Sequence, residues 1–470
     1  MFEKVLIANR GAIAVRIART CERLGIATVA VYSEVEADSL HRQTCDEGVC
    51  VGPARVQESY LNQDAILAAA KQTGAQAIHP GYGLLSENPE FVRKVEAAGL
   101  TFVGPSADCI ELFGDKVRAK ELARQAGVRV TPGSDAALAD PDQAVREADD
   151  IGYPVLVKAA GGGGGIGMQI VQESADLLKA LEVCRGRARS AFGDERVYLE
   201  RYIDRPRHVE VQVIGDRQGQ LVALGERECS IQRRHQKIVE ESPAPALIFG
   251  RHAEERREAL FDAAVRIAQE AKYYGVGTAE FILDAEGRAY FMEWNPRLQV
   301  EHAVTEMCTG LDLVELQLRV AAGDALTNEV LRAEPRGHSM EARIYAEDSL
   351  KGFIPKPGEV KTLRWPPLAP GSLRIETGIA PGSKVTPYYD PMVAKVVTFG
   401  ATRHQALLTL DRVLAETEIE PLVTNVAFLR CILAHDAFRA GQYDTDFVQR
   451  LLVELAERPQ EPARESLAPQ

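Results

Sequence analysis

The chain has 470 residues, 46% of them hydrophobic, which is enough to bury a large core divided among two to four domains. A formal net charge of −13 disfavours nucleic acid as a partner and favours a soluble cytoplasmic enzyme. The sequence has no apolar run long enough to span a membrane and no signal-peptide pattern at its N-terminus. The eight cysteines are scattered without a C-x-x-C pair, which predicts free thiols in a reducing compartment.

The N-terminal end predicts a strand, a helix and a second strand. Residues 4–9 are apolar and strand-like, Ile13 and Ile17 recur at helical spacing, and residues 27–32 form another apolar run. The intervening glycine turn lacks the G-x-G-x-x-G fingerprint, so a Rossmann-like half is expected rather than a dinucleotide site. Residues 75–83 then predict a strand that runs into a turn.

Two side chains of that turn have two open interpretations. His79 and Tyr82 either pack inside the turn or border a ligand. Helix-start signals follow at residues 86–89.

A glycine-rich segment, residues 161–167, follows the predicted strand 154–160. Ordering so many glycines is entropically unfavourable, so stability does not explain them, whereas their N–H groups can approach phosphates. No Lys-Ser/Thr pair closes the segment as in a phosphate loop, and Lys158 instead precedes it on the strand. A flexible linker is the alternative, but the flanking strands favour a hairpin lid over phosphates. Lys116 lies ahead of a predicted helix, where a lone lysine is usually a surface charge. The predicted lid over phosphates favours a ligand-binding role for Lys116.

Residues 207–214 and 220–224 predict a strand pair with His208 on its leading edge. The segment 226–237 that follows is dense in charge. Because it lacks aromatic residues for stacking and the protein is acidic, it is better interpreted as the wall of a pocket for an anionic ligand than as a nucleic-acid patch. An amphipathic helix is expected over residues 259–274.

Residues 277–283 and 289–293, separated by turn residues 284–287, predict a β-hairpin. Glu280 and Glu293 can then face each other across the sheet, and two neighbouring carboxylates require positive charge between them. With Asn295 nearby, this oxygen-rich group suits magnesium together with substrate phosphates.

Polar residues continue beyond the hairpin. Arg297 offers a planar fork for a small oxyanion, Gln299 an amide, and Glu301 a carboxylate that can accept a proton. The alternative is a solvated loop with ordinary surface charges, but that explains poorly why so many polar groups end an apolar hairpin.

These segments, with two more downstream, carry a family resemblance. The motifs are Ala8-Asn9-Arg10-Gly11, His79-Pro80-Gly81-Tyr82-Gly83, Lys158 with its glycines, residues 233–237, residues 293–302, residues 340–348 and residues 388–392. Together they resemble biotin carboxylase, the ATP-grasp component of biotin-dependent carboxylases, in order over residues 2–447. The resemblance implies ADP-forming carboxylation of carrier-bound biotin by ATP and bicarbonate through carboxyphosphate.

The resemblance also implies an α/β fold with α+β elements. It comprises a Rossmann-like pre-ATP-grasp domain over residues 1–112, an ATP-grasp domain over 113–330 whose mobile glycine-rich lid spans about 131–203, and a biotin carboxylase C-terminal domain over 331–447. The Pro-, Glu- and Ala-rich end of the chain is expected to be disordered, within a tail over residues 448–470.

The resemblance assigns site residues to three groups. ATP would contact Lys116, Lys158, Gly163, Gly164, Gly165, Glu200, Arg201, Tyr202, Ile203, His208, Gln232, His235 and Ile282. Magnesium or manganese would bind Glu280 and Glu293 with Asn295 nearby. Bicarbonate would bind Lys237, Arg297, Gln299 and the backbone of Val300, Glu301 would deprotonate it, and Arg343 would face biotin; Arg297, Glu301, Lys237 and Arg343 form the expected catalytic set.

One departure concerns the lid, where the family commonly has basic residues at the positions of Ile166 and Gln169. Glycine N–H groups would then have to hold the phosphates, with weaker ATP binding or altered lid closure.

The expected partners follow from what the chain lacks. It has no Ala-Met-Lys-Met site, so a separate biotin carrier protein and a separate carboxyltransferase are expected, and the resemblance implies a homodimer. The carboxyltransferase would choose the final acceptor, acetyl-CoA or another acyl-CoA being expected and pyruvate remaining open.

Two alternatives stay open. Another ATP-grasp carboxylate ligase would share Lys116, Lys158 and the carboxylate pair but would not need the catalytic set. A non-catalytic ATP-binding regulatory partner is supported only by the uncharged lid positions.

Overall fold

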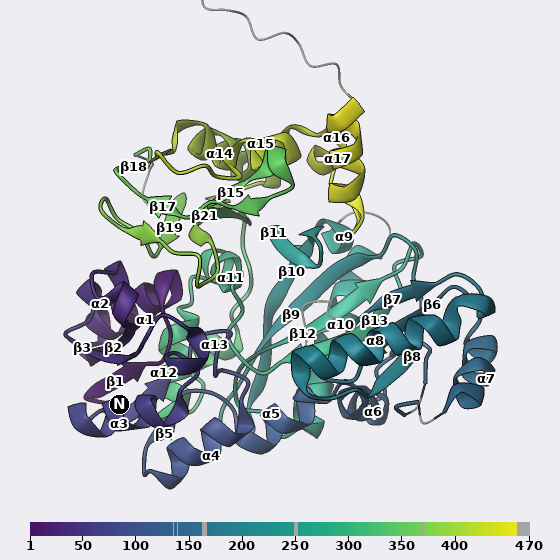
Figure 1. The fold of residues 1–470 in the computed structure, drawn as a ribbon, viewed down its shortest axis with the longest axis horizontal. Coiled ribbons are helices and arrows are strands. Elements are labelled where there is room, and N and C mark those ends of the chain that lie inside the picture. The colour runs from purple at the N-terminus through teal and green to yellow at the C-terminus, as the bar shows by residue number, and fades with distance from the viewer. Residues whose placement is uncertain (135, 139, 162–166, 249–251, 368–370, 458–470) are drawn as a thin grey trace, which may run out of the picture.

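The computed structural model describes residues 1–134, 136–138, 140–161, 167–248, 252–367 and 371–457 (Figure 1). The chain begins with a parallel sheet in the order β3-β2-β1-β4-β5. Its strands are β1 (Lys4–Ile7), β2 (Ala27–Ser33), β3 (Glu47–Gly52), β4 (Ala77–His79) and β5 (Thr101–Phe102). Its helices are α1 (Gly11–Leu24), α2 (Leu40–Thr44), α3 (Gln63–Thr73), α4 (Pro89–Ala97) and α5 (Ala107–Gly114). The predicted strand-helix-strand opening is confirmed.

A small antiparallel sheet, β7-β6-β8, forms a separate unit at the right of Figure 1. It contains β6 (Val155–Ala159), β7 (Gln169–Val171), β8 (Val197–Arg201), α7 (Pro141–Ile151) and α8 (Leu177–Phe192). Its buried apolar side chains form a cluster of their own. The predicted hairpin is present as β6 and β7, while Gly163, Gly164, Gly165 and Ile166 lie outside the described residues.

The centre of the molecule is an eight-stranded sheet in the order β13-β12-β9-β10-β11-β14-β21-β19, with antiparallel neighbours. The strands are β9 (Arg207–Gly215), β10 (Leu221–Arg233), β11 (Gln236–Ser242), β12 (Gly275–Leu283), β13 (Ala289–Asn295), β14 (His338–Tyr345), β19 (Leu373–Thr377) and β21 (Met392–Gly400). Because β11 pairs with β14, residues 207–295 and residues 338–400 contribute to one sheet.

Further helices and short strands complete the fold. The helices are α6 (Lys116–Gln125), α9 (Pro245–Ile248), α10 (Ala253–Glu270), α11 (His302–Thr309), α12 (Leu313–Ala321), α13 (Asn328–Leu331), α14 (Arg403–Glu416), α15 (Val426–Ala434) and α16 (Asp436–Arg439). The short strands form three pairs: β15 (Glu347–Asp348) with β16 (Ile354–Pro355), β17 (Gly358–Glu359) with β20 (Lys384–Val385), and β18 (Thr362–Arg364) with β22 (Glu418–Glu420). Helix α10, expected over 259–274, begins and ends a few residues earlier.

The predicted tail is wrong over its first ten residues. Residues Phe447–Glu457 form helix α17, and Phe447, Val448 and Leu451 are buried in the core of the C-terminal domain. Apolar residues recur there at helical spacing, which buries one face and offsets the entropy lost on ordering. Residues 458–470 lie outside the described residues.

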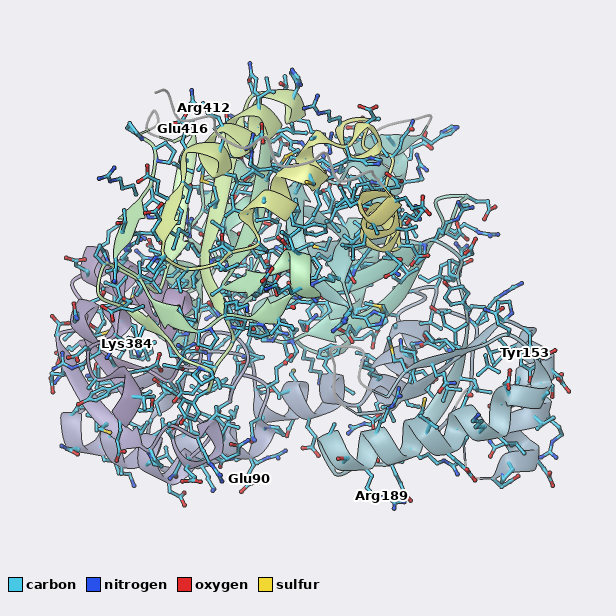
Figure 2. All side chains as sticks on the ribbon, turned by 45° about the horizontal axis from the view of Figure 1, so that its top comes forward. Glu90, Tyr153, Arg189, Lys384, Arg412 and Glu416 are labelled. Carbon is cyan, nitrogen blue, oxygen red and sulfur yellow. The ribbon has the colours of Figure 1, made fainter. Side chains whose placement is uncertain are left out.

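Charged side chains project from the outer helices, as Glu90, Arg189 and Glu416 do in Figure 2. Within the described parts of the chain, each helix falls short of the length and apolar character that crossing a bilayer demands. All eight cysteines lie in these parts and are free thiols, as predicted.

Candidate active site

A cavity of about 1070 Å³ lies where the small sheet, the β10–β11 turn, the β12–β13 hairpin and β14 meet. The sequence-predicted residues that line it are Lys116, Lys158, Glu200, Arg201, Tyr202, Ile203, His208, Gln232, His235, Lys237, Glu280, Ile282, Glu293, Asn295, Arg297, Gln299, Val300, Glu301 and Arg343. These residues come from segments more than two hundred positions apart, so the fold gathers the predicted set in one place.

In the β12–β13 hairpin Glu280 lies opposite Glu293, as predicted, just beyond a register shift between Glu280 and Phe281. A cation contacts each carboxylate: Lys116 Nζ lies 3.0 Å from Glu293 Oε2, and Lys237 Nζ lies 2.9 Å from Glu280 Oε1. Asn295 Nδ2 also donates to Glu280 Oε1 over 2.9 Å. The two carboxylates and the Asn295 carbonyl form an all-oxygen donor set facing the cavity, which fits magnesium or manganese.

Lys237 joins three buried carboxylates. Its Nζ lies 2.6 Å from Glu210, 2.9 Å from Glu280 and 2.6 Å from Glu301. Burial alone would lower the pKa of Lys237, but the three carboxylates outweigh it and raise the pKa well above its ordinary value. The ammonium is therefore charged and fixed at the floor of the cavity.

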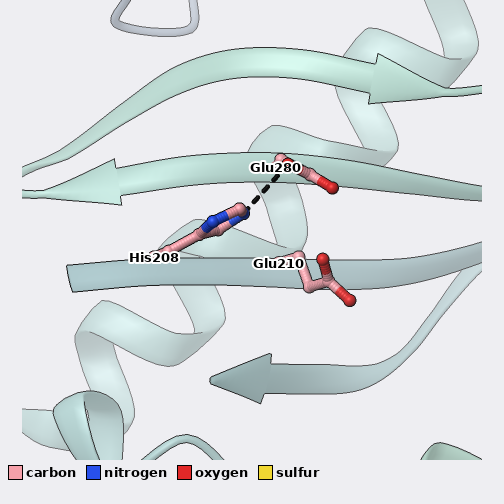
Figure 3. A group of neighbouring side chains, drawn as sticks. All are labelled: His208, Glu210 and Glu280. Carbon is pink, nitrogen blue, oxygen red and sulfur yellow. Dashed lines mark ion pairs between the residues drawn. The ribbon is translucent and has the colours of Figure 1, made fainter. Parts of the chain in front are cut away.

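His208, Glu210 and Glu280 lie close enough together to suggest a metal site of their own (Figure 3). His208 Nε2 is 2.9 Å from Glu280 Oε2. However, Glu210 does not line the cavity and is already paired with both Arg227 and Lys237, whereas Glu280 and Glu293 both line the cavity, so the latter pair is the better cation site.

Glu301 is held between two cations. It lies 2.6 Å from Lys237 Nζ, and Arg343 Nη2 donates to its second oxygen over 2.9 Å. Burial would raise the pKa of Glu301, but Lys237 and Arg343 outweigh burial and hold the pKa far below its usual range. Glu301 is consequently ionised in this state.

Arg297 is anchored by groups on three sides. Its guanidinium donates to Asn295 Oδ1 over 3.0 Å and to Gln299 Oε1 over 3.2 Å, and it pairs with Glu87 over 3.1 Å. Glu87 lies just before α4 in the N-terminal domain and was absent from the sequence-predicted set. The fork of Arg297 is thus oriented before any ligand arrives.

The opposite wall of the cavity carries a cluster of lysines. Lys158 on β6 donates to Glu200 Oε2 over 3.1 Å, and Lys120 on α6 contacts the other oxygen of Glu200. Burial and the charge of Lys116 lower the pKa of Lys158 to about 7. Lys120 and Lys158 are buried and Lys116 is partly buried, and the three share the carboxylates of Glu200 and Glu293. Burial and the neighbouring lysines lower the pKa values of Lys120 and Lys158, and an anionic ligand beside them would favour their charged forms.

The turn between β10 and β11 places two more predicted residues. Arg234 and His235 adopt positive φ, which folds the turn back over the cavity. Gln232 Nε2 lies 2.6 Å from His208 Nδ1 and also donates to the Cys229 carbonyl. The charge-dense segment is therefore a pocket wall, as predicted.

His79 and Tyr82 have different environments. His79 is fully buried, its Nδ1 accepts the Gly81 N–H over 3.0 Å, and burial lowers its pKa to about 3. It packs inside the turn. Tyr82 lines the cavity and therefore borders the ligand site.

Sequence reasoning missed residues that support the site from behind. Arg227 is fully buried and holds Glu210 at 2.5 Å, with further bonds to Gln212, Thr278 and Thr305. Lys120 and Glu87 resemble ordinary helix-surface charges in the sequence. Arg227 itself was the available signal in the sequence. An arginine at an inward-facing position of a strand requires a buried acid beside it, which would have pointed to Glu210.

Three family models match the chain in succession. Residues 1–110 match the biotin carboxylase N-terminal domain, residues 115–329 the ATP-binding domain of the carbamoyl-phosphate synthase L chain, and residues 341–450 the biotin carboxylase C-terminal domain. The chain is 50% identical over 448 residues, 95% of its length, to a biotin carboxylase of Halalkalibacterium halodurans, of which it covers 97%.

The chain belongs to the biotin carboxylase family. It is an ATP-grasp ligase, and the activity of its family is ATP-dependent carboxylation of biotin. Biotin carboxylase 1 of Bacillus subtilis is 48% identical, with 96% of this chain and 98% of the relative covered. The human mitochondrial propionyl-CoA carboxylase alpha chain is 46% identical across 95% of this chain but only 61% of the relative.

Solved structures share the fold. The biotin carboxylase domain of the 2-oxoglutarate carboxylase of Hydrogenobacter thermophilus, a dimer with MgADP and bicarbonate, has a TM-score of 0.90 and 43% identity, covering 96% of this chain and 98% of that one. A nucleotide complex of the Campylobacter jejuni biotin carboxylase has a TM-score of 0.91 and 43% identity, with coverage of 96% and 99%.

Proposed function

We propose that this chain catalyses the first half-reaction of a biotin-dependent carboxylase at the cavity described above. ATP and bicarbonate form carboxyphosphate, and the carboxyl group passes to biotin on a carrier protein. The observation that supports this most is the convergence of a lysine-rich wall, a carboxylate pair and the set Lys237, Arg297, Glu301 and Arg343 in one cavity.

ATP would lie along the lysine-rich side. Lys116 and Lys158 neutralise its phosphates, with His208, Gln232 and His235 around the ribose and phosphates. The adenine would lie against residues 200–203 and Ile282, with Gly163, Gly164 and Gly165 over the phosphates. Phosphoryl transfer depends mainly on such positioning and charge neutralisation.

Glu280, Glu293 and Asn295 would hold magnesium or manganese. The bound metal ion would supply charge neutralisation at the phosphates. Lys116 and Lys237 contact these carboxylates now, so each carboxylate keeps a cation whether or not a metal ion is present. MgADP in the Hydrogenobacter thermophilus structure supports this assignment.

Bicarbonate would lie between Lys237, Arg297, Gln299 and the backbone of Val300. Arg297 presents a planar fork that suits a carboxylate-like anion. Glu301 would accept the bicarbonate proton as an oxygen of the anion attacks the γ-phosphorus. Bound anions draw Lys237 and Arg343 away from Glu301, which raises its basicity toward this role.

Arg343 would face biotin. Carboxyphosphate releases carbon dioxide and phosphate, and that phosphate removes the ureido proton. Negative charge then develops on the biotin oxygen, where the guanidinium of Arg343 stabilises it. Burial lowers the pKa of Arg343, but Glu240 and Glu301 outweigh burial and raise it, so the cation is permanent.

The partners are inferred from the family. A separate biotin carrier protein would bring biotin, and a separate carboxyltransferase would pass the carboxyl group to acetyl-CoA or another acyl-CoA. A homodimer is supported by the dimeric Hydrogenobacter thermophilus domain.

The deciding experiment measures ADP release by the purified chain with and without bicarbonate and free biotin. We expect ATP cleavage that requires bicarbonate and rises with biotin. An ATP-grasp ligase for another carboxylate, or a non-catalytic ATP-binding partner, would show neither dependence.

A further inference from the structure

The loop between β13 and α11 carries Arg297, Gln299, Val300 and Glu301, and it pairs with no strand among the described residues. Its side chains line the cavity, yet two of its backbone carbonyls are bound on the side away from it. His302 Nδ1 lies 2.8 Å from the Gln299 carbonyl oxygen. The ammonium of Lys395 donates to the Val300 carbonyl oxygen.

These two contacts fix the peptide planes on either side of Val300. In a planar trans peptide the C=O and the following N–H point in opposite directions. A carbonyl of Gln299 bound by His302 therefore aims the Val300 N–H the other way, toward the cavity that Val300 lines. The bond from Lys395 fixes the plane that leads into Glu301.

The state of His302 supports this geometry. A ring nitrogen that faces a carbonyl oxygen must carry the proton, so Nδ1 is the donor and Nε2 carries an unshared electron pair. Burial, reinforced by the charge of Lys395, lowers the pKa of His302 to about 4, so the ring is neutral. Among the described residues, Nε2 has no hydrogen-bond partner, although Glu306 and Glu376 lie 3.9 and 3.8 Å away.

Lys395 is itself held rigidly. It is fully buried on β21, with Glu376 at 2.7 Å and Glu341 at 3.7 Å. The register makes Lys395 the neighbour of Glu376 on β19 and of Arg343 on β14, so the three lie in one row across the sheet. Lys395 and Arg343 thus grip consecutive residues of the loop, one by the Val300 carbonyl and the other by the Glu301 carboxylate.

The acids near His302 do not form a metal site. Glu306 pairs with Arg16 at 2.9 Å and with Arg374 at 2.6 Å, and Glu376 pairs with Lys395 and contacts Arg374. Because these cations already neutralise both carboxylates, the cluster is better interpreted as an anchor for Lys395.

We propose that Lys395 and His302 are positioning residues that hold the Val300 amide and the Glu301 carboxylate in their bicarbonate-binding geometry. The inference rests on the proposed function, in which this loop receives bicarbonate. It predicts that loss of either donor loosens the loop and weakens bicarbonate binding, while the nucleotide side of the cavity stays intact.

The test uses two pairs of variants of the full chain. Lys395→Met combined with Glu376→Gln removes the donor without leaving its main acid unpaired, and His302→Leu removes the second donor. Lys395→Arg and His302→Asn keep a donor near the same position and are the conservative partners. Arg403→Met is the matched control, since it removes a buried ion pair with Glu241 that does not touch the loop.

Two readouts are measured: the KM for bicarbonate beside the Kd for ADP, and amide hydrogen exchange of the peptide containing residues 296–303. We expect the two donor-less variants to raise the bicarbonate KM about tenfold, with the ADP Kd unchanged, because small misplacements of binding groups have effects of this size. Exchange should accelerate in that peptide, and the conservative variants should resemble the wild type.

Folded donor-less variants with wild-type exchange and an unchanged bicarbonate KM would overturn the inference. So would equal losses in bicarbonate and ADP binding, or the same changes in Arg403→Met, since these indicate general loosening. A wild-type chain without bicarbonate-dependent ATP cleavage would instead refute the proposed function, and the exchange measurement would still decide whether the two residues hold the loop.

Discussion

Replacing Glu301 by Gln tests the centre of the proposed chemistry with little change in shape. The amide keeps one oxygen acceptor but cannot take a proton from bicarbonate. Both cations that contact Glu301 retain other acids: Lys237 keeps Glu210 and Glu280, and Arg343 keeps Glu240 at 2.5 Å. The variant is therefore expected to fold, with a stability loss of about 1–2 kcal/mol from weakened charged hydrogen bonds.

The expected effect on turnover is much larger than the effect on folding. A positioned general base contributes roughly 10²- to 10⁴-fold to rate, which corresponds to about 3–5 kcal/mol of transition-state stabilisation. Since Glu301 touches the two cations that would hold the substrates, part of the loss should appear as a higher bicarbonate KM. The loss should fall mainly on kcat, because proton removal accompanies the attack on ATP.

The assay is bicarbonate-dependent ADP release at saturating ATP, with free biotin as acceptor. Glu240→Gln is the matched control, because Glu240 is equally buried and also contacts Arg343 but does not line the cavity. Glu240→Gln therefore removes a buried acid beside Arg343 and leaves the Glu301 carboxylate in place. Turnover of Glu301→Gln within about threefold of the wild type would refute the assignment of the base.

Three further outcomes are expected. Glu293→Gln should raise the free magnesium needed for half-maximal ATP cleavage by about 10- to 100-fold, and an unchanged magnesium titration would exclude Glu293 as a ligand. Gln169→Arg restores one basic lid position and should lower the ATP KM about fivefold, because the added charge attracts the phosphates by ~1 kcal/mol. An unaltered ATP KM would count against a phosphate-binding role for this lid position. Burial lowers the pKa values of His41, His79 and His302 to about 4, 3 and 4, below the ordinary histidine pKa of 6.5. As pH falls through 6.5, these histidines therefore take up protons in the unfolded chain but not in the folded chain. Stability should therefore fall by about 2 kcal/mol per histidine between pH 7 and about pH 5 in urea titrations, and His41→Gln should remove about a third of that slope; a variant with the full slope would contradict the linkage.

Local patterns predicted the hairpin and its carboxylate pair correctly. Alternation and the turn residues 284–287 predict the hairpin, but the pairing set at the turn would place Glu280 opposite Met292. A register shift between Glu280 and Phe281 moves the pairing by one residue and puts Glu293 there instead. The opening strand-helix-strand unit follows from equally local signals. The tail prediction failed because composition at the very end of the chain outweighed the helical spacing of Phe447, Val448 and Leu451.

Sequence patterns could not predict the contacts between segments that are distant along the chain. The three acids around Lys237 come from β9, β12 and the loop before α11, and only the order of strands in the central sheet brings them together. Lys120 and Glu87 read as surface charges because their partners, Glu200 and Arg297, belong to other elements. The residues proposed to contact substrate came from the family resemblance, whereas the residues that orient them could be found only from the fold.

The continuous central sheet from β13 to β19 links the strands that carry Glu280 and Arg343. Four strand pairings separate β12, which carries Glu280, from β14, which carries Arg343. Moving these two strands apart would require breaking at least one of those pairings, such as that between β11 and β14. The small sheet β7-β6-β8 lies outside this ladder and has a hydrophobic core of its own, so its position depends instead on polar contacts such as that between Glu200 and Lys120 on α6.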